Sequence, residues 1–202
     1  MPTDAPLRLM LPFATDDELA RLVDFRETFI KWGRKFSFTA VKEGDIDRLL
    51  IAPSAWLGYA YRNDQTAGPV ADFGCGAGIP GLVMALLHEA PYLLIDSHTK
   101  KQGFISHYVL TRKLFHVKQF DRRYRGEEDR PGDIARVVSR AAGSMGEVAR
   151  LFPTVKEFDF FKGSDAGEEG FQLMQERPGV TLLRLDTPDW FGDLSIIRVT
   201  LP

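Results

Sequence analysis

Seven consecutive residues, Asp-Phe-Gly-Cys-Gly-Ala-Gly at positions 72–78, are the part of this 202-residue chain whose types and spacing most clearly indicate chemistry. The three glycines stand between an apolar segment and a helix-forming one, where a strand should end and a helix begin. Glycine tolerates positive φ and lets a ligand lie against the backbone. The N–H groups of the following helix attract anionic groups, and Pro80 fits its first turn. The segment therefore predicts a ligand-binding turn.

Two nucleoside cofactors are compatible with such a turn. Residues 76–81 spell the dinucleotide pattern G-x-G-x-x-G, and Asp96 follows twenty positions after the first glycine of that pattern. In a dinucleotide site, however, the first glycine directly follows the strand. Here that residue is Gly74, and counting from it puts Ile79 where the third glycine is required. The glycines of residues 72–78 instead resemble motif one of class I methyltransferases. This favours S-adenosylmethionine and leaves a nicotinamide oxidoreductase as the weaker alternative.

Asp96 follows the next apolar segment, residues 93–95. In class I methyltransferases the glycine loop lies beside the methionine part of the cofactor, and the acid that ends the second strand binds the ribose hydroxyls. The position of Asp96 suits that second role.

The rest of the chain supplies elements able to position these residues. Thr15 and Glu18 have the spacing of a capping box and predict a helix from 15 to about 34, with apolar residues every three or four positions. A second helix is expected over 45–61, followed by a polar break. From there strands and helices alternate. The expected strands are 70–73, 92–95, 115–120, 134–138, 158–161, 180–185 and 194–201, and the expected helices are 79–88, 100–113, 144–152 and 167–176.

This order of elements predicts an α/β fold with a doubly wound, mostly parallel, Rossmann-like sheet. No helical pattern separates the last two strands, so they should form an antiparallel C-terminal hairpin. We expect a single methyltransferase domain over 1–202, in which 1–66 are an N-terminal helical cap and 67–202 the cofactor-binding core.

Composition narrows the function further. Hydrophobic residues make up 44%, charged residues 27%, and the net charge is −2, so any contact with nucleic acid must come from a local basic patch. The single cysteine, Cys75, permits no internal disulfide, and the four histidines lack metal-ligand spacing, so no metal site is expected. Neither a signal peptide nor a membrane-spanning run is visible. A cytoplasmic protein without membrane contact is predicted, and a monomer is the working expectation.

The chain is similar over nearly its whole length to the GidB-type bacterial methyltransferases, which modify guanine N7 of small-subunit ribosomal RNA. Residues 72–81 resemble the family's D-V-G-T/S-G-x-G-L/F-P-G, and residues 137–141 its V-x-S-R-A. Further matching motifs are the L-L-D-S-like residues 94–97 with Lys100, Lys101 and Phe104, the K-G at 162–163, and the segments 31–32 and 36–39.

The resemblance implies S-adenosylmethionine as cofactor and small-subunit rRNA, or the ribosomal particle, as partner. Together with the glycine loop, it assigns cofactor binding to Asp72, Gly74, Gly76, Gly78, Ile79, Asp96, Ser97, Tyr124, Arg125 and Arg140. Arg140, which follows the expected fourth strand, is the candidate catalytic residue. The candidate RNA-binding residues are Lys100, Lys101, Arg123 and Lys162.

Three positions depart from the family pattern. Its R-H-x-x-D-S reads Arg-Leu-Leu-Ile-Ala-Pro at residues 48–53, Arg125 stands where a glutamate is usual, and an Arg-His pair is replaced near Gly192 and Asp193. Guanine N7 carries a lone pair and no hydrogen, so its methylation needs positioning and electrostatics and no general base. Two alternatives therefore stay open: a methyltransferase of this fold with another substrate, and a cofactor-binding protein without turnover.

Overall fold

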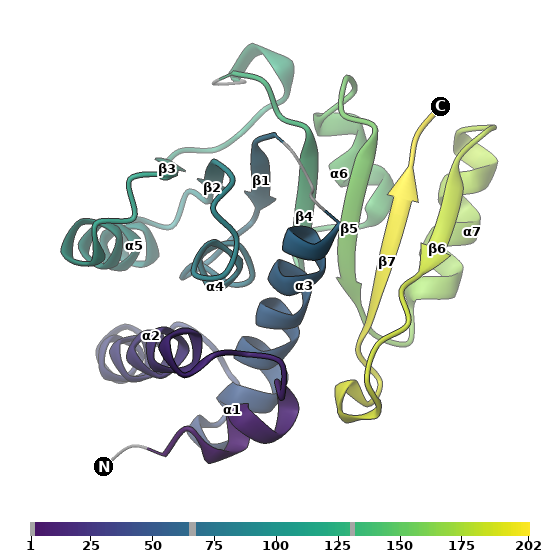
Figure 1. Ribbon diagram of the computed structural model, residues 1–202. Coiled ribbons are helices and arrows are strands. Elements are labelled where there is room, and N and C mark those ends of the chain that lie inside the picture. The colour runs from purple at the N-terminus through teal and green to yellow at the C-terminus, as the bar shows by residue number, and fades with distance from the viewer. Residues whose placement is uncertain (1–2, 65–67, 130–131) are drawn as a thin grey trace.

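A seven-stranded sheet in the order β3-β2-β1-β4-β5-β7-β6 forms the centre of the molecule (Figure 1). The computed structural model describes residues 3–64, 68–129 and 132–202. The parallel strands are β1 (Val70–Phe73), β2 (Tyr92–Ile95), β3 (Val117–Phe120), β4 (Arg136–Arg140) and β5 (Glu157–Lys162). The last two, β6 (Thr181–Arg184) and β7 (Ser195–Thr200), are antiparallel, and β7 lies between β5 and β6.

Both faces of the central strands are buried: successive strand residues point to opposite sides, and each side packs against an apolar core. Tyr92 and Leu94 belong to one apolar core and Leu93 and Ile95 to the other. β2 accordingly is a continuous apolar run of four residues, whereas the edge strands β3 and β6 carry exposed residues.

The connecting helices divide between the two faces. Three helices follow strands β1, β2 and β4: α4 (Gly81–Ala85), α5 (Thr99–Arg112) and α6 (Met145–Leu151). The fourth, α7 (Ala166–Glu176), follows β5. Helices α4 and α5 contribute to the core that contains Tyr92, whereas α6 and α7 contribute to the core that contains Leu93. Figure 1 shows α6 and α7 on one side of the sheet and the other helices on the opposite side.

The helices before the sheet pack against the α4–α5 face. They are α1 (Ala5–Met10), α2 (Asp16–Phe36), the short turn η1 (Glu43–Asp45), the π-helical segment η2 (Asp47–Ile51) and α3 (Ala52–Asn63). Leu7, Phe25 and Leu57 share one apolar core with Leu94 of β2. We infer that this cap and the sheet form one domain, as the sequence predicts.

The expected α/β class, the parallel sheet, the antiparallel hairpin and the helical cap are confirmed. The capping box is also present: the Thr15 hydroxyl accepts from the Glu18 N–H, and the Glu18 carboxylate accepts from the Thr15 N–H. The helix expected at 79–88 is shorter, and the one expected at 45–61 is π-helical at Asp47–Ile51, before α3 begins. Helix α1 was not predicted, because its six residues are too few for a periodic pattern. No helix in the described parts of the chain is long and apolar enough to cross a membrane.

Candidate functional site

The glycine turn connects β1 to α4 at the carboxyl edge of the sheet, where ligands bind in folds of this kind. Gly74, Gly76 and Gly78 all have positive φ, at 74°, 55° and 89°. A Cβ at Gly74 would lie 2.1 Å from the Ala142 Cβ, and one at Gly78 would lie 2.7 Å from the Leu82 Cβ. A Cβ at Gly76 would meet only the Lys101 side chain, with Nζ 3.7 Å away. The fold therefore requires glycine at position 74. At position 76 the missing side chain leaves open space beside the Lys101 ammonium.

Asp72 is fully buried beneath this turn and lines neither cavity described below. Its Oδ2 accepts a hydrogen bond of 2.6 Å from the Gly81 N–H at the start of α4. Burial raises the pKa of this carboxyl to about 8, although the Gly81 hydrogen bond and the charge of Arg140 oppose the shift. Asp72 was predicted to bind the cofactor; the structure places it beneath the loop, where it accepts from the Gly81 N–H.

Asp96 joins the glycine turn to the end of β2. Its carboxylate accepts from the Gly76 N–H at 2.9 Å and from the His98 N–H at 2.7 Å. Two backbone donors thus fix its orientation, while each carboxylate oxygen keeps a further lone pair for a ligand. Ser97 follows it as an exposed residue.

Two cavities adjoin Asp96, and both are lined by Gly74, Asp96 and Ala142. The first, of about 330 Å³, includes Ser97, Arg123 and Tyr124. The second, of about 350 Å³, includes Gly76, Ile79, Lys101 and Arg140. The structure thus brings most of the predicted site residues together in a cleft that runs across the carboxyl ends of β1, β2 and β4.

Arg140 ends β4 and reaches from the sheet to the cap. Its Nη2 donates a hydrogen bond of 2.6 Å to the Leu49 carbonyl in the π-helical segment η2. Its Nη1 is buried and has no hydrogen-bond partner among the described residues. Burial lowers the pKa of Arg140 to about 10, so the guanidinium remains charged at neutral pH. The next residue, Ala141, has a φ of 54°, a strained value for a side chain with a Cβ. An unsatisfied buried donor beside strained backbone is typical of a ligand site.

Five predicted residues line neither cavity: Asp72, described above, and Gly78, Arg125, Lys100 and Lys162. Arg125 is exposed and lines neither cavity, so a cofactor contact by its side chain is not supported. Lys100 is exposed on α5, above the Phe36 ring. Lys162 is buried, and its Nζ donates to Glu169 Oε1 at 2.7 Å and to the Gly143 carbonyl at 3.1 Å. The charge of Lys162 is thus compensated within the chain, and its part in RNA binding stays a prediction.

The cap supplies cavity residues that were not predicted. Phe29, Phe38, Thr39 and Leu50 line the cavity that contains Arg140. Phe38 and Thr39 belong to a segment that matches a family motif, which was the available signal. Phe29 and Leu50 read as ordinary core residues in the sequence, because only the packing of α2 and η2 against the glycine turn brings them to the cavity.

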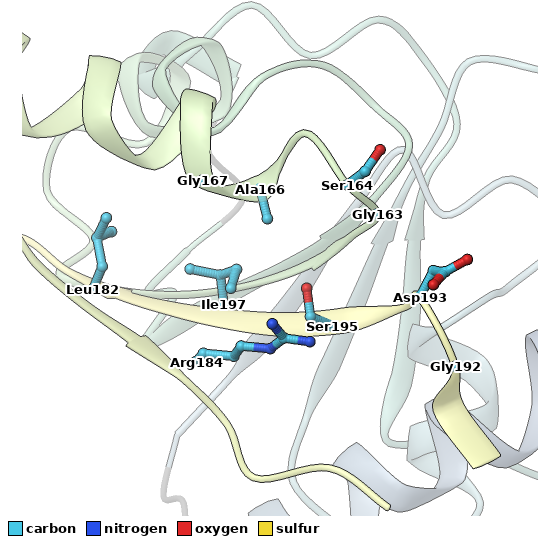
Figure 2. Close-up of a pocket in the computed structure, with 10 residues that line it drawn as sticks. All are labelled: Gly163, Ser164, Ala166, Gly167, Leu182, Arg184, Gly192, Asp193, Ser195 and Ile197. Carbon is cyan, nitrogen blue, oxygen red and sulfur yellow. The ribbon is translucent and has the colours of Figure 1, made fainter. Parts of the chain in front are cut away.

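A larger hollow of about 750 Å³ lies at the same edge of the sheet, next to β5 (Figure 2). Its walls are the start of α7, the end of β6 and the start of β7, and its charged lining residues are Arg184 and Asp193. Figure 2 shows the Arg184 guanidinium beside Ser195, and the apolar side chains of Leu182 and Ile197 line the same hollow. Neither Gly74 nor Asp96 lines this hollow, so it is separate from the cleft.

Comparison with solved structures supports the fold. The chain superposes on ribosomal protein L11 methylase from Lactobacillus delbrueckii subsp. bulgaricus with a TM-score of 0.54 and 15% identity, over 76% of this chain and 81% of that one. Precorrin-6y C5,15-methyltransferase from Geobacter metallireducens gives a TM-score of 0.53 and 14% identity, over 73% and 87%. At these identities the likeness establishes a class I methyltransferase fold.

Comparison of sequences identifies the family. A protein from Halorhodospira halophila named ribosomal RNA small subunit methyltransferase G is 34% identical over 161 residues, which are 78% of this chain and 72% of that protein. One of the same name from Marinomonas sp. is 26% identical over 193 residues, or 92% and 90%. The family model described as GidB, rRNA small subunit methyltransferase G, matches residues 18–172. With its glycine turn, Asp96 and Arg140 in one cleft, the chain belongs to the GidB family of small-subunit rRNA methyltransferases.

Proposed function

We propose that this protein transfers the methyl group of S-adenosylmethionine to N7 of a guanine in small-subunit ribosomal RNA. The observation that carries the proposal is the cleft itself, in which residues of β1, β2 and β4 meet around Asp96 and Arg140. Membership of the GidB family supports both the methyl donor and the RNA substrate. We expect the protein to act in the cytoplasm, where its proposed substrate is located.

The residues of the cleft fit this cofactor. Gly74 and Gly76 leave a backbone surface without side chains, and the Asp96 carboxylate stands between the two cavities with lone pairs to accept hydroxyl protons. Tyr124 is packed against Phe152, with ring centroids 4.7 Å apart, and forms an apolar wall of the first cavity. We infer that the first cavity holds the adenosine part and the second, beside Arg140, the methionine part.

When bound, the cofactor supplies an electrophilic methyl group on a sulfonium. The chain has to orient the acceptor, keep water away and stabilise charge. Phe29, Phe38 and Leu50 exclude water from the second cavity. The unsatisfied Nη1 of Arg140 can donate to a carboxylate or a carbonyl oxygen there. Guanine N7 attacks with its own lone pair, so no base has to remove a proton first. The reaction therefore requires no general base among the cleft residues.

The family departures bear on the choice between this function and its alternatives. Leu49 stands where the family has a histidine, yet it contacts Arg140 through its backbone carbonyl, which any residue supplies equally well. The substitution therefore leaves the position of the guanidinium intact. Asp193 stands where a basic pair is usual, and it lies in the hollow beside β5, outside the cleft. The departures spare the cofactor cleft, which favours retained turnover over a protein that only binds the cofactor.

Methylation of small-subunit particles that lack the modification tests the proposal. The purified protein should transfer labelled methyl groups from S-adenosylmethionine, and nuclease digestion with mass spectrometry should find 7-methylguanosine. Binding of S-adenosylhomocysteine without methylated RNA would indicate another substrate. Loss of that binding as well would indicate a protein that has lost the cofactor. Stabilisation by NAD, and not by S-adenosylhomocysteine, would restore the nicotinamide alternative.

A further inference from the structure

The end of α2 and the start of α5 form a surface on which lysines alternate with aromatic rings. The two helices run antiparallel, because Asp24 bonds to Tyr108 at one end while Phe36 meets Lys100 at the other. The Phe36 ring is partly buried, and its centroid lies 5.3 Å from Lys35 Nζ and 5.8 Å from Lys100 Nζ. We call this surface, with Lys31, Trp32, Lys35, Phe36, Lys100 and His107, the α2–α5 face. Figure 1 shows α2 and α5 lying side by side at the edge of the molecule.

The lysines of the α2–α5 face are available for an external anion. Within the described chain, no carboxylate lies within 4.0 Å of Lys31, Lys35 or Lys100. Two nearby arginines differ, since Arg34 and Arg112 each form two hydrogen bonds to a carboxylate. Because the net charge of the chain is −2, an uncompensated cluster of cations here is a local feature.

This face continues into the second cavity of the cleft. The Phe36 ring is followed by the Phe38 ring, with centroids 6.3 Å apart and planes inclined by 22°, and Phe38 lines the cavity. Lys101, one residue after Lys100, also lines it and reaches toward Gly76. A nucleic acid strand whose target base enters this cavity would therefore cross the α2–α5 face.

The hollow beside β5 is a poorer path for a polyanion. Asp193 is one of its lining residues (Figure 2), and α7, whose start also lines it, carries Asp165 at its N-cap and Glu168 in its first turn. The charge of Lys162 is compensated by its ion pair with Glu169. Arg184 is then the one cation that lines the hollow among the described residues, and Asp193 lines it as well. Phosphates would be repelled there and attracted to the α2–α5 face.

We propose that the α2–α5 face binds an unpaired segment of RNA that flanks the methylated base. An unpaired base stacks on the Phe36 ring, and the phosphates on either side contact Lys35 and Lys100. Aromatic rings between cations are the usual way in which proteins bind single-stranded RNA. This inference rests on the proposed function and adds the residues that hold the substrate outside the cleft.

Binding of the full chain to a short single-stranded RNA, followed by fluorescence anisotropy at several salt concentrations, tests the proposal. The double variant Lys35→Gln/Lys100→Gln should bind about tenfold more weakly, and the slope of log K against log salt should fall in magnitude by about 1.4, because each contact to single-stranded RNA contributes about 0.7. Phe36→Leu keeps the apolar packing but loses the π face. It should weaken binding by about tenfold and leave the salt slope unchanged.

Two matched controls separate these effects from general ones. Lys156→Gln removes an exposed lysine at the start of β5, on the opposite edge of the sheet, and Phe115→Leu removes a ring that is 77% exposed before β3. Both should bind RNA and S-adenosylhomocysteine as the unmodified protein does. The α2–α5 variants should also keep their cofactor affinity and, in the methylation assay, show a raised KM for RNA with an unchanged kcat, since they do not touch the reacting atoms.

The outcomes distinguish the inference from the function beneath it. If the protein methylates RNA but the α2–α5 variants bind like the controls, the inference is wrong and the function stands. If the variants bind free RNA normally but bind intact small-subunit particles weakly, the face contacts another part of the particle and the assignment to unpaired RNA is wrong. If the unmodified protein neither binds nor methylates RNA, the proposed function fails first.

Discussion

Arg140 and Leu49 are joined by a 2.6 Å hydrogen bond from the guanidinium to a backbone carbonyl, although 91 positions separate them in sequence. The carbonyl belongs to the π-helical segment η2, where the widened turn changes the backbone hydrogen-bond pattern. Arg140 belongs to β4 at the carboxyl edge of the sheet. This bond holds the cap against the cleft and leaves the second arm of the guanidinium, Nη1, free for a ligand.

Arg140→Lys should therefore weaken cofactor binding while leaving the fold intact. An ammonium places its donors at one point and cannot reproduce the two arms of a guanidinium, one on Leu49 and one in the cavity. We expect the Kd for S-adenosylhomocysteine, measured by calorimetry, to rise about tenfold, which corresponds to one charge-assisted hydrogen bond. Arg184→Lys, in the separate hollow beside β5, is the matched control and should not change that Kd. An unchanged Kd for Arg140→Lys would place the cofactor elsewhere.

The sequence predicts the sheet and the glycine turn well because both depend on local features. Apolar runs identify the strands, and Gly74 directly after β1 identifies the type of turn. Long-range packing is not visible in this way. The pattern around Leu49 suggests an ordinary helix, and nothing in it indicates a π-helical turn whose carbonyl meets β4. Lys162 has the position of a ligand-binding residue at the end of β5, and only the three-dimensional structure shows Glu169 of α7 beside it.

Gly74→Ala should abolish cofactor binding and destabilise the protein. The new Cβ would lie 2.1 Å from the Ala142 Cβ, and the backbone φ of 74° is unfavourable for alanine. Relief of both strains requires the turn to move, at a cost of about 2–4 kcal/mol in the free energy of unfolding. Urea denaturation measures that cost, and calorimetry with S-adenosylhomocysteine measures the loss of binding.

Gly103→Ala is the control for this substitution. Gly103 lies in α5 with open space around its Cα, so an added methyl group meets nothing. Alanine is the better helix former, and the free energy of unfolding should rise by about 0.5–1 kcal/mol with binding unchanged. If Gly74→Ala behaved like Gly103→Ala, the tight approach of the turn to Ala142 would be refuted.

Asp72→Asn should stabilise the protein in a manner that depends on pH. Burial raises the pKa of the folded-state carboxyl to about 8, whereas an unfolded aspartic acid has a pKa of about 3.9. Between these values the unfolded chain releases a proton that the folded chain retains, so the stability of the unmodified protein falls as pH rises, by up to about 1.4 kcal/mol per pH unit. Above about pH 8 both states are ionised and the loss levels off.

Asparagine does not ionise, and its amide oxygen can still accept from the Gly81 N–H. The stability difference between Asp72→Asn and the unmodified protein should therefore grow from about pH 5 to about pH 8 and then stay constant. Urea unfolding at several pH values measures this difference. Asp121→Asn, at an exposed position, is the control and should show no such growth. A difference that is the same at every pH would mean that Asp72 is ionised in the folded protein throughout.

Lys162→Met should lower stability without weakening RNA binding. The ammonium and the Glu169 carboxylate form a 2.7 Å ion pair whose side chains are 9% and 17% exposed, and Glu169 also accepts from the Met145 N–H at the start of α6. Removal of the lysine leaves a largely buried carboxylate without its cation, which should cost about 2–4 kcal/mol in the free energy of unfolding. The double variant Lys162→Met/Glu169→Gln should recover part of this loss, because no charge is then left unpaired.

RNA affinity, measured well below the unfolding transition, should stay within about twofold of the unmodified protein, since this ammonium does not face solvent. A loss of RNA affinity as large as that of Lys35→Gln/Lys100→Gln, with stability unchanged, would return Lys162 to the RNA-binding residues.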